Sequence, residues 1–167
     1  MKLSEIQELD EVTARAMRYL RPKDHYKFGQ MVKRTFYEVK ELQRLFYEPD
    51  HFQELIKYIL TFVTEKDPDV PKFFSFMNYL RKEISLINEI EEAALSYYPT
   101  SDEHRAGVER FAKYGYMMPI DSLAGGDVLK YELIKKVPYE VAFTKLSMEK
   151  DRADFDKALF EIRKPRK

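Results

Sequence analysis

Hydrophobic side chains recur along this chain at the three-to-four-residue spacing of amphipathic helices, and prolines and capping residues separate the stretches. Segments with strand-like alternation of any real length are missing, and so are Asn-Gly hairpin turns. The fold class is therefore predicted to be all-α, with six or seven helices in a mostly antiparallel bundle that ends in a C-terminal helical pair. The predicted helices cover residues 4–20, 24–48, 50–63, 72–97, 101–114, 127–136 and 138–163.

Local signals mark the ends of these helices. Ser4, Asp24, Asp50 and Asp127 are good N-cap residues, and Ser101 and Asp102 open a further helix that Gly115 closes. The third stretch is β-branched toward Val63, so a strand is its main alternative. Residues 116–127 have turn and loop chemistry. They mark a possible boundary inside what we interpret as a single domain over residues 1–167.

The centres of the apolar stripes predict the core. These positions are Phe36, Val39, Ile56, Leu60, Leu80, Ile84 and Ile87. The last helix is predicted to turn a second set inward: Val141, Ala142, Leu146, Ala153, Phe155, Leu159 and Ile162.

Composition excludes several kinds of chemistry. Of 167 residues none is cysteine, which excludes disulfides, thiol nucleophiles and Cys-based zinc sites. Five glycines are too few for typical phosphate-binding loops. Glu48-x-x-His51 has the spacing of di-iron ligands, but Pro49 interrupts the helix within it and no second copy exists. The three histidines each follow an acid at a predicted helix start, which is typical of capping residues. We therefore expect no enzyme activity, metal or cofactor.

The net charge of the chain does not favour nucleic-acid binding, because 29 basic side chains balance 29 acidic ones. The segment 21–44 is the best nucleic-acid candidate, yet acidic residues interleave its basic ones. A helix-turn-helix over 127–146 is a weaker one, since its second helix begins with little basic character. Hydrophobic runs are too short to cross a bilayer, and no signal peptide is visible. We expect a cytoplasmic protein, or a virion component if the chain is phage-encoded.

Two charged groups are candidates for partner binding. The C-terminal tail carries Arg163, Lys164, Arg166 and Lys167, and the acidic group contains Glu89, Glu91, Glu92, Asp102 and Glu103. The tail is either a solvated end or docks on the acidic group of the same chain or the next subunit.

Aromatic residues form 14% of the chain and occur in runs. One run ends in Met117 and Met118. Tyrosine and methionine are frequent at protein interfaces, and a wide buried stripe is the alternative.

The C-terminal third carries a family resemblance. Leu123-Ala124-Gly125-Gly126-Asp127-Val128-Leu129-Lys130-Tyr131, Val137-Pro138-Tyr139 and Leu146-Ser147-Met148-Glu149-Lys150 resemble small helical proteins from the structural-gene modules of tailed phages that infect Bacteroides-like hosts. The resemblance implies a non-catalytic neck, tail, connector or tail-assembly component and carries over no binding residue. Taken with the residue patterns, it favours a protein–protein interaction or assembly protein that self-associates or binds protein partners. The alternative is a nucleic-acid-associated regulatory protein that uses the 21–44 face and the tail.

Overall fold

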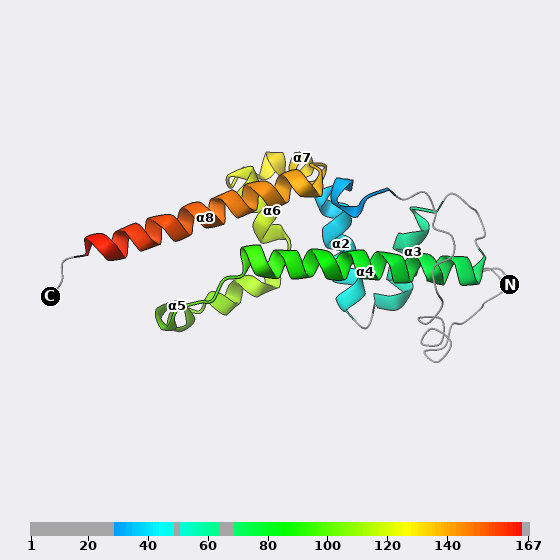
Figure 1. The fold of residues 1–167 in the computed structure, drawn as a ribbon, viewed down its shortest axis with the longest axis horizontal. Coiled ribbons are helices and arrows are strands. Elements are labelled where there is room, and N and C mark those ends of the chain that lie inside the picture. The colour runs from blue at the N-terminus through cyan, green and yellow to red at the C-terminus, as the bar shows by residue number, and fades with distance from the viewer. Residues whose placement is uncertain (1–28, 49–50, 64–68, 165–167) are drawn as a thin grey trace. The chain divides into compact units, whose positions relative to one another are not determined.

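The computed structural model describes residues 29–48, 51–63 and 69–164 (Figure 1). Its regular elements are helical, which confirms the all-α fold class. The α-helices are α2 (Phe36–Tyr47), α3 (Phe52–Leu60), α4 (Val70–Leu95), α5 (Ser101–Ala106), α6 (Met117–Ala124), α7 (Tyr131–Lys135) and α8 (Tyr139–Arg163). Three short 3₁₀ helices, η2 (Met31–Lys33), η4 (Val108–Tyr114) and η5 (Val128–Lys130), accompany them. The predicted helix over 4–20 and the caps at Asp24 and Asp50 lie outside the described residues.

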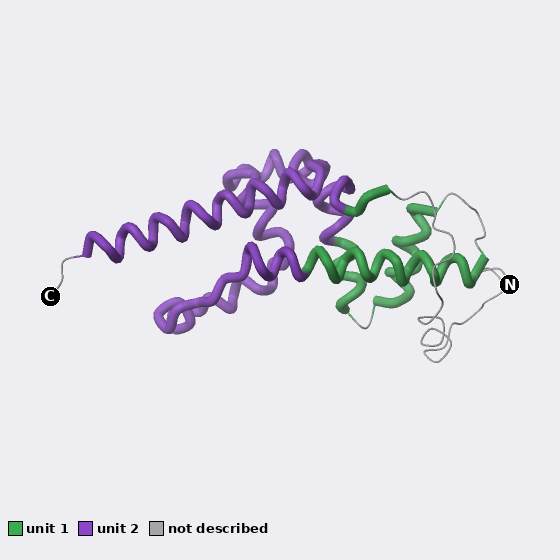
Figure 2. Tube along the Cα trace, in the orientation of Figure 1, with its two compact units in different colours: residues 1–31, 41–88 green, residues 32–40, 89–167 purple. Residues whose placement is uncertain are grey.

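The chain divides into two compact units (Figure 2). Unit 1 contains residues 1–31 and 41–88, and unit 2 contains residues 32–40 and 89–167. The division falls within α2 and α4, whereas the sequence pointed to residues 116–127 as the possible boundary.

The core of unit 1 comes from α2, α3 and α4. Phe73, Phe74 and Phe76 at the start of α4 are all buried, and the first two pack edge to face with ring centroids 5.8 Å apart. On α3 the buried residues are Leu55 and Ile59, while the predicted Ile56 and Leu60 are only half-buried. The prediction therefore named the residues next to the buried ones on the same apolar stripe of α3. The other core residues of the unit are Met31, Leu42, Leu45, Val70, Met77, Leu80, Ile84 and Ile87.

Unit 2 joins the start of α2 to the start of α8. The backbone N–H of Phe36 donates to the carbonyl oxygen of Val137 at 2.7 Å, and the N–H of Tyr139 donates to that of Arg34 at 2.8 Å. The ring of Tyr139 stacks on that of Phe36, with centroids 6.2 Å apart. Phe36 and Tyr139 are buried together with Val39, Ile120, Ala124 and Ala142, the core residues of this unit.

The second predicted helix begins later than expected. A capping box at Thr35 and Glu38 opens α2: the Glu38 N–H donates to Thr35 Oγ1 at 3.2 Å, and the Thr35 N–H donates to the Glu38 carboxylate at 2.9 Å. Gly29 lies before it with φ of 79°, in a region that an α-helix does not use. A helix starting at residue 24 could not pass through that glycine unbroken.

The predicted helix over 101–114 is divided. Thr100 and Glu103 form a capping box at the start of α5, and Gly107 ends that helix with φ of 80°. The chain then continues as η4. The spacing of Val108, Phe111 and Ala112 suggested one continuous helix. That spacing does not reveal the left-handed backbone of Gly107, which precedes them.

Residues 116–127 are largely helical, so their interpretation as a loop was wrong. Pro119 lies in the first turn of α6, where the backbone N–H groups have no helical partner in any case, and it therefore costs no hydrogen bond. Gly125 caps the end with φ of 65°. The predicted cap at Asp127 is confirmed, since its carboxylate accepts from the Leu129 N–H at 3.0 Å.

Candidate functional site

The predicted acidic group contains residues with different surroundings. Glu89 and Glu92 are exposed near the end of α4, whereas Glu91 is half-buried. Lys40 Nζ donates to both oxygens of Glu91 at 2.7 Å, and the Tyr139 hydroxyl donates to the same carboxylate at 2.5 Å. Burial and the bond to Glu91 raise the pKa of Tyr139 well above its ordinary value. Glu91 thus forms part of the unit 2 interior.

Glu103, another member of the acidic group, is held locally. Its carboxylate accepts from the Tyr97 hydroxyl and from both the N–H and the hydroxyl of Thr100. These bonds, the one from Tyr97 first, lower the pKa of Glu103 from 4.5 to about 2, and the charge of Lys157 adds to the effect. The group of α8 that stabilises the Glu103 carboxylate is therefore Lys157, which lies upstream of the tail.

The basic tail is exposed where the structure describes it. Arg163 is the last residue of α8, and Lys164 Nζ lies 3.6 Å from Glu161 Oε1 of the same helix. Arg166 and Lys167 lie outside the described residues. The structure therefore shows a contact of Lys164 with its own helix and leaves docking of the tail on the acidic group as a prediction.

Met117 and Met118 lie in the first turn of α6, in unit 2. Met118 is 42% exposed, while Met117 is half-buried. Tyr116, just before them, meets the ring of Tyr37 edge to face with centroids 6.1 Å apart. Of the two methionines, Met118 is the one presented at the surface.

The histidines form ion-pair contacts. His51 Nδ1 lies 2.8 Å from Glu54, and His51 Nε2 lies 3.1 Å from Glu48. Arg44 binds both of these glutamates and Glu41, so a fixed positive charge occupies the place that a metal would need. Within the described residues, no three or more His, Asp or Glu side chains lie together in a way that could hold a metal ion. His104 pairs with Glu109, and His25 lies outside the described residues.

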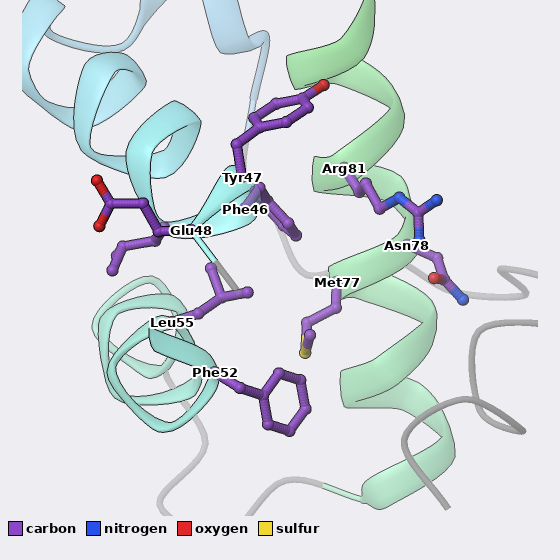
Figure 3. Close-up of a pocket in the computed structure, with 9 residues that line it drawn as sticks. Phe46, Tyr47, Glu48, Phe52, Leu55, Met77, Asn78 and Arg81 are labelled. Carbon is purple, nitrogen blue, oxygen red and sulfur yellow. The ribbon is translucent and has the colours of Figure 1, made fainter. Parts of the chain in front are cut away.

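Unit 1 contains a pocket that the sequence did not indicate. Its volume is about 340 Å³, near the lower limit for small-ligand sites. Phe46, Phe52, Leu55 and Met77 converge on it from three helices (Figure 3). Its remaining lining residues are Leu45, Tyr47, Glu48, Asn78 and Arg81. Glu48 is already paired with Arg44 and His51. The pocket suits an apolar side chain, and its lining offers no nucleophile with an adjacent base.

Unit 2 exposes many large apolar side chains. Of the 25 residues of α8, only Tyr139 and Ala142 are buried, and residues 151–158 are all exposed. The predicted inward residues of α8 are therefore wrong at Ala153, which is exposed, and at Val141, Phe155 and Ile162, which are 53%, 63% and 80% exposed. The unit also exposes Ile90, Tyr97, Tyr98, Phe111, Tyr114, Met118, Val128, Leu129, Leu133, Met148 and Phe160. We call these side chains, together with Val141, Phe155 and Ile162, the apolar surface of unit 2.

The basic residues of segment 29–44 are paired with acids. Lys33 contacts Glu140 at 2.5 Å, Arg34 contacts Glu38 at 3.7 Å, and Lys40 and Arg44 contact glutamates at 2.7 and 2.6 Å. These carboxylates neutralise much of the positive charge that the sequence suggested for nucleic acid. Arg21, Lys23 and Lys27 lie outside the described residues.

Comparisons with known proteins assign no family. The sequence matches no protein-family model, and neither the curated proteins nor the solved structures contain a significant match. Among the described helices, none combines the length and the hydrophobicity that crossing a membrane requires.

Proposed function

We propose that this chain is a non-catalytic assembly protein that binds protein partners through the apolar surface of unit 2. The observation that carries the proposal is α8, whose last twenty-odd residues include large apolar side chains and none that is buried. Most helical stability in proteins comes from the packing of an apolar face, so a partner that covers α8 would stabilise it. Extended exposed apolar surface is typical of sites that bind other proteins.

The titratable groups support a structural role. Six carboxylates of the described residues have lowered pKa values. Each accepts hydrogen bonds from basic side chains, from backbone N–H groups or from hydroxyls: Glu54, Glu103, Glu109, Asp127, Glu132 and Glu149. Each shift follows from a local contact that stabilises a helix end or an ion pair. Such contacts account for the perturbed groups without a reaction.

The resemblance of the segment from Leu123 to Lys150 to phage structural-module proteins suggests the kind of assembly. We propose a neck, tail or tail-assembly component of a tailed phage. That segment includes η5, in which Leu129 is 86% exposed and Val128 is 66% exposed. The segment that carries the resemblance thus also supplies part of the apolar surface of unit 2.

Site-specific photo-crosslinking in the cells that produce the protein tests this function. A photoreactive phenylalanine analogue is placed at Leu129, at Phe155 or, as a matched control, at Arg105, whose side chain is 84% exposed but charged. We expect discrete protein–protein crosslinks from the two apolar positions and none from the control. Virion proteins among the products would support the phage assignment. Crosslinks to nucleic acid alone, or none from either apolar position, would overturn the proposal.

A further inference from the structure

Four charged side chains of unit 1 form a closed ring at the junction of α2 and α3. Arg44 lies on α2, Glu48 directly follows that helix, and His51 precedes the first turn of α3, which contains Glu54. Arg44 Nη1 lies 3.0 Å from Glu48, and Arg44 Nη2 lies 2.9 Å from Glu54. His51 contacts the same two carboxylates, at 3.1 Å through Nε2 and at 2.8 Å through Nδ1. We call these four residues the α2–α3 ring.

Glu41 adds a third carboxylate to the surroundings of Arg44. It is only 7% exposed, and Arg44 binds both of its oxygens, through Nη2 at 2.6 Å and through Nε at 3.2 Å. A guanidinium keeps its charge at every physiological pH, so Arg44 is a permanent cation that three carboxylates share. One positive charge does not balance three negative ones, and a second cation beside Glu48 and Glu54 therefore stabilises the ring.

Other charged groups nearby do not supply this second cation. Lys57 of α3, and Arg81 of α4, which lines the same pocket as Glu48, form no ion pair among the described residues. Asp50 lies outside the described residues. His51 is therefore the member of the ring whose charge changes near neutral pH, because histidine is the side chain that ordinarily titrates there.

The two ring nitrogens of His51 both lie against carboxylate oxygens, and the protonation state decides how well they fit. A neutral imidazole has one N–H and one lone pair, so one of the two carboxylates would meet a lone pair. The imidazolium has an N–H on each nitrogen and a positive charge that attracts both carboxylates. The N-terminus of α3 disfavours a cation, but its partial charge is spread over the first turn, whereas Glu48 and Glu54 are full charges within 3.1 Å.

We infer that the α2–α3 ring is a proton-dependent link: the imidazolium of His51 holds the first turn of α3 to the end of α2, and loss of its proton weakens the attachment of α3. The inference is independent of the proposed function, since the ring lies in unit 1 and the apolar surface in unit 2. Because α3 supplies Phe52 and Leu55 to the pocket of unit 1, the link also makes one wall of that pocket sensitive to pH (Figure 3).

The direction of the pH dependence follows from where the protons are bound. Stability falls with rising pH wherever the folded chain holds a proton that the unfolded chain has released. The attachment of α3 should therefore weaken as pH rises through about 5 to 8, the range in which histidine side chains lose their charge. At acid pH Glu54 acts in the opposite sense. The bond from Arg44, and after it that from His51, lowers the pKa of Glu54 from 4.5, so its contribution is lost as pH falls below that value.

Amide hydrogen exchange of α3 in the full-length protein tests this link. Protection factors, which correct each rate for the intrinsic effect of pH, are measured at about pH 5.5 and about pH 8, on either side of the histidine titration. We expect the protection of α3 to fall about threefold between them in the wild type, as a networked ion pair of this exposure allows. In His51→Gln, whose side chain does not titrate, it should stay constant. A wild type without the fall, or an equal fall in His51→Gln, would overturn the inference.

His104 provides the matched control, because within the described part of the chain it contacts a carboxylate through one nitrogen only. Its Nδ1 lies 2.5 Å from Glu109, and a neutral imidazole can donate a bond there. His104→Gln should therefore leave the fall in α3 protection unchanged. Glu54→Gln leaves His51 beside a single carboxylate and should abolish most of the fall. If His104→Gln removes the fall, or Glu54→Gln preserves it in full, the ring does not link α3 to α2 in this way.

Discussion

The Tyr139 hydroxyl is expected to contribute more to the stability of unit 2 than any exposed polar group of the chain. It donates to Glu91 at 2.5 Å while its ring is only 3% exposed. Tyr139→Phe keeps the ring stacked on Phe36 and removes only this bond. A hydrogen bond to a charged group contributes about 1.5–3 kcal/mol, so the free energy of unfolding should fall by that amount. Lys40 remains as a partner of Glu91, which favours the lower half of the range.

Urea denaturation followed by far-UV circular dichroism measures this loss. The slope of the free energy against urea should stay unchanged, because the exposed area on unfolding is the same. Tyr98→Phe is the matched control, since Tyr98 is 81% exposed and should change stability by less than about 0.5 kcal/mol. A loss below about 0.5 kcal/mol for Tyr139→Phe would refute the assignment of a stabilising bond there.

The same bond predicts a dependence on alkaline pH. In the folded chain the pKa of Tyr139 is raised above its ordinary 10.0, chiefly by burial and then by Glu91. Above pH 10 the unfolded tyrosine releases its proton while the folded one keeps it, so the unfolded state binds fewer protons and stability falls as pH rises. Tyr139→Phe should reduce this slope in thermal melts; an identical slope would contradict the raised pKa.

Four further substitutions test the helices. Leu80→Ala, at a fully buried site, should cost about 2–5 kcal/mol in urea denaturation, and Ile56→Ala, which is half-buried, should cost clearly less; equal losses would contradict the face assigned to α3. Because the pKa of Glu103 is lowered from 4.5 to about 2, the stability that it contributes should be lost as pH falls through that window, and Glu103→Gln should remove the dependence in amide exchange of α5. Gly107→Ala should destabilise the chain by at least about 1 kcal/mol in thermal melts, since φ is 80° and the new Cβ would lie 2.8 Å from Arg110 Nη2; an unchanged midpoint would contradict that conformation.

Periodicity predicted the helices well where a helix is buried along one face. The stripe through Leu80, Ile84 and Ile87 is fully buried in α4, as predicted. The end of α8 near Arg163 and the cap at Asp127 also followed from local residue chemistry. Helix starts were less predictable, because the left-handed backbone at Gly29 interrupts the helix predicted over 24–48 and α2 opens only after Thr35.

Burial on α8 could not be predicted from its pattern. An apolar row at helical spacing looks the same whether it faces its own core or a partner, and Phe155 and Ile162 were therefore assigned inward. The pocket of unit 1 and the bonds of Glu91 depend on residues distant in sequence, such as Phe46 with Met77, and no local pattern encodes such pairs.

Sedimentation velocity of the full chain against its Phe155→Asp variant tests most directly whether the exposed face of α8 is an association surface. Phe155 is 63% exposed, so the substitution should leave helix content unchanged. We expect the wild-type mass to rise above 20.0 kDa with concentration and the variant to stay at the monomer mass. A wild-type chain that remains at 20.0 kDa up to about 100 μM, or a variant that associates equally well, would contradict the account.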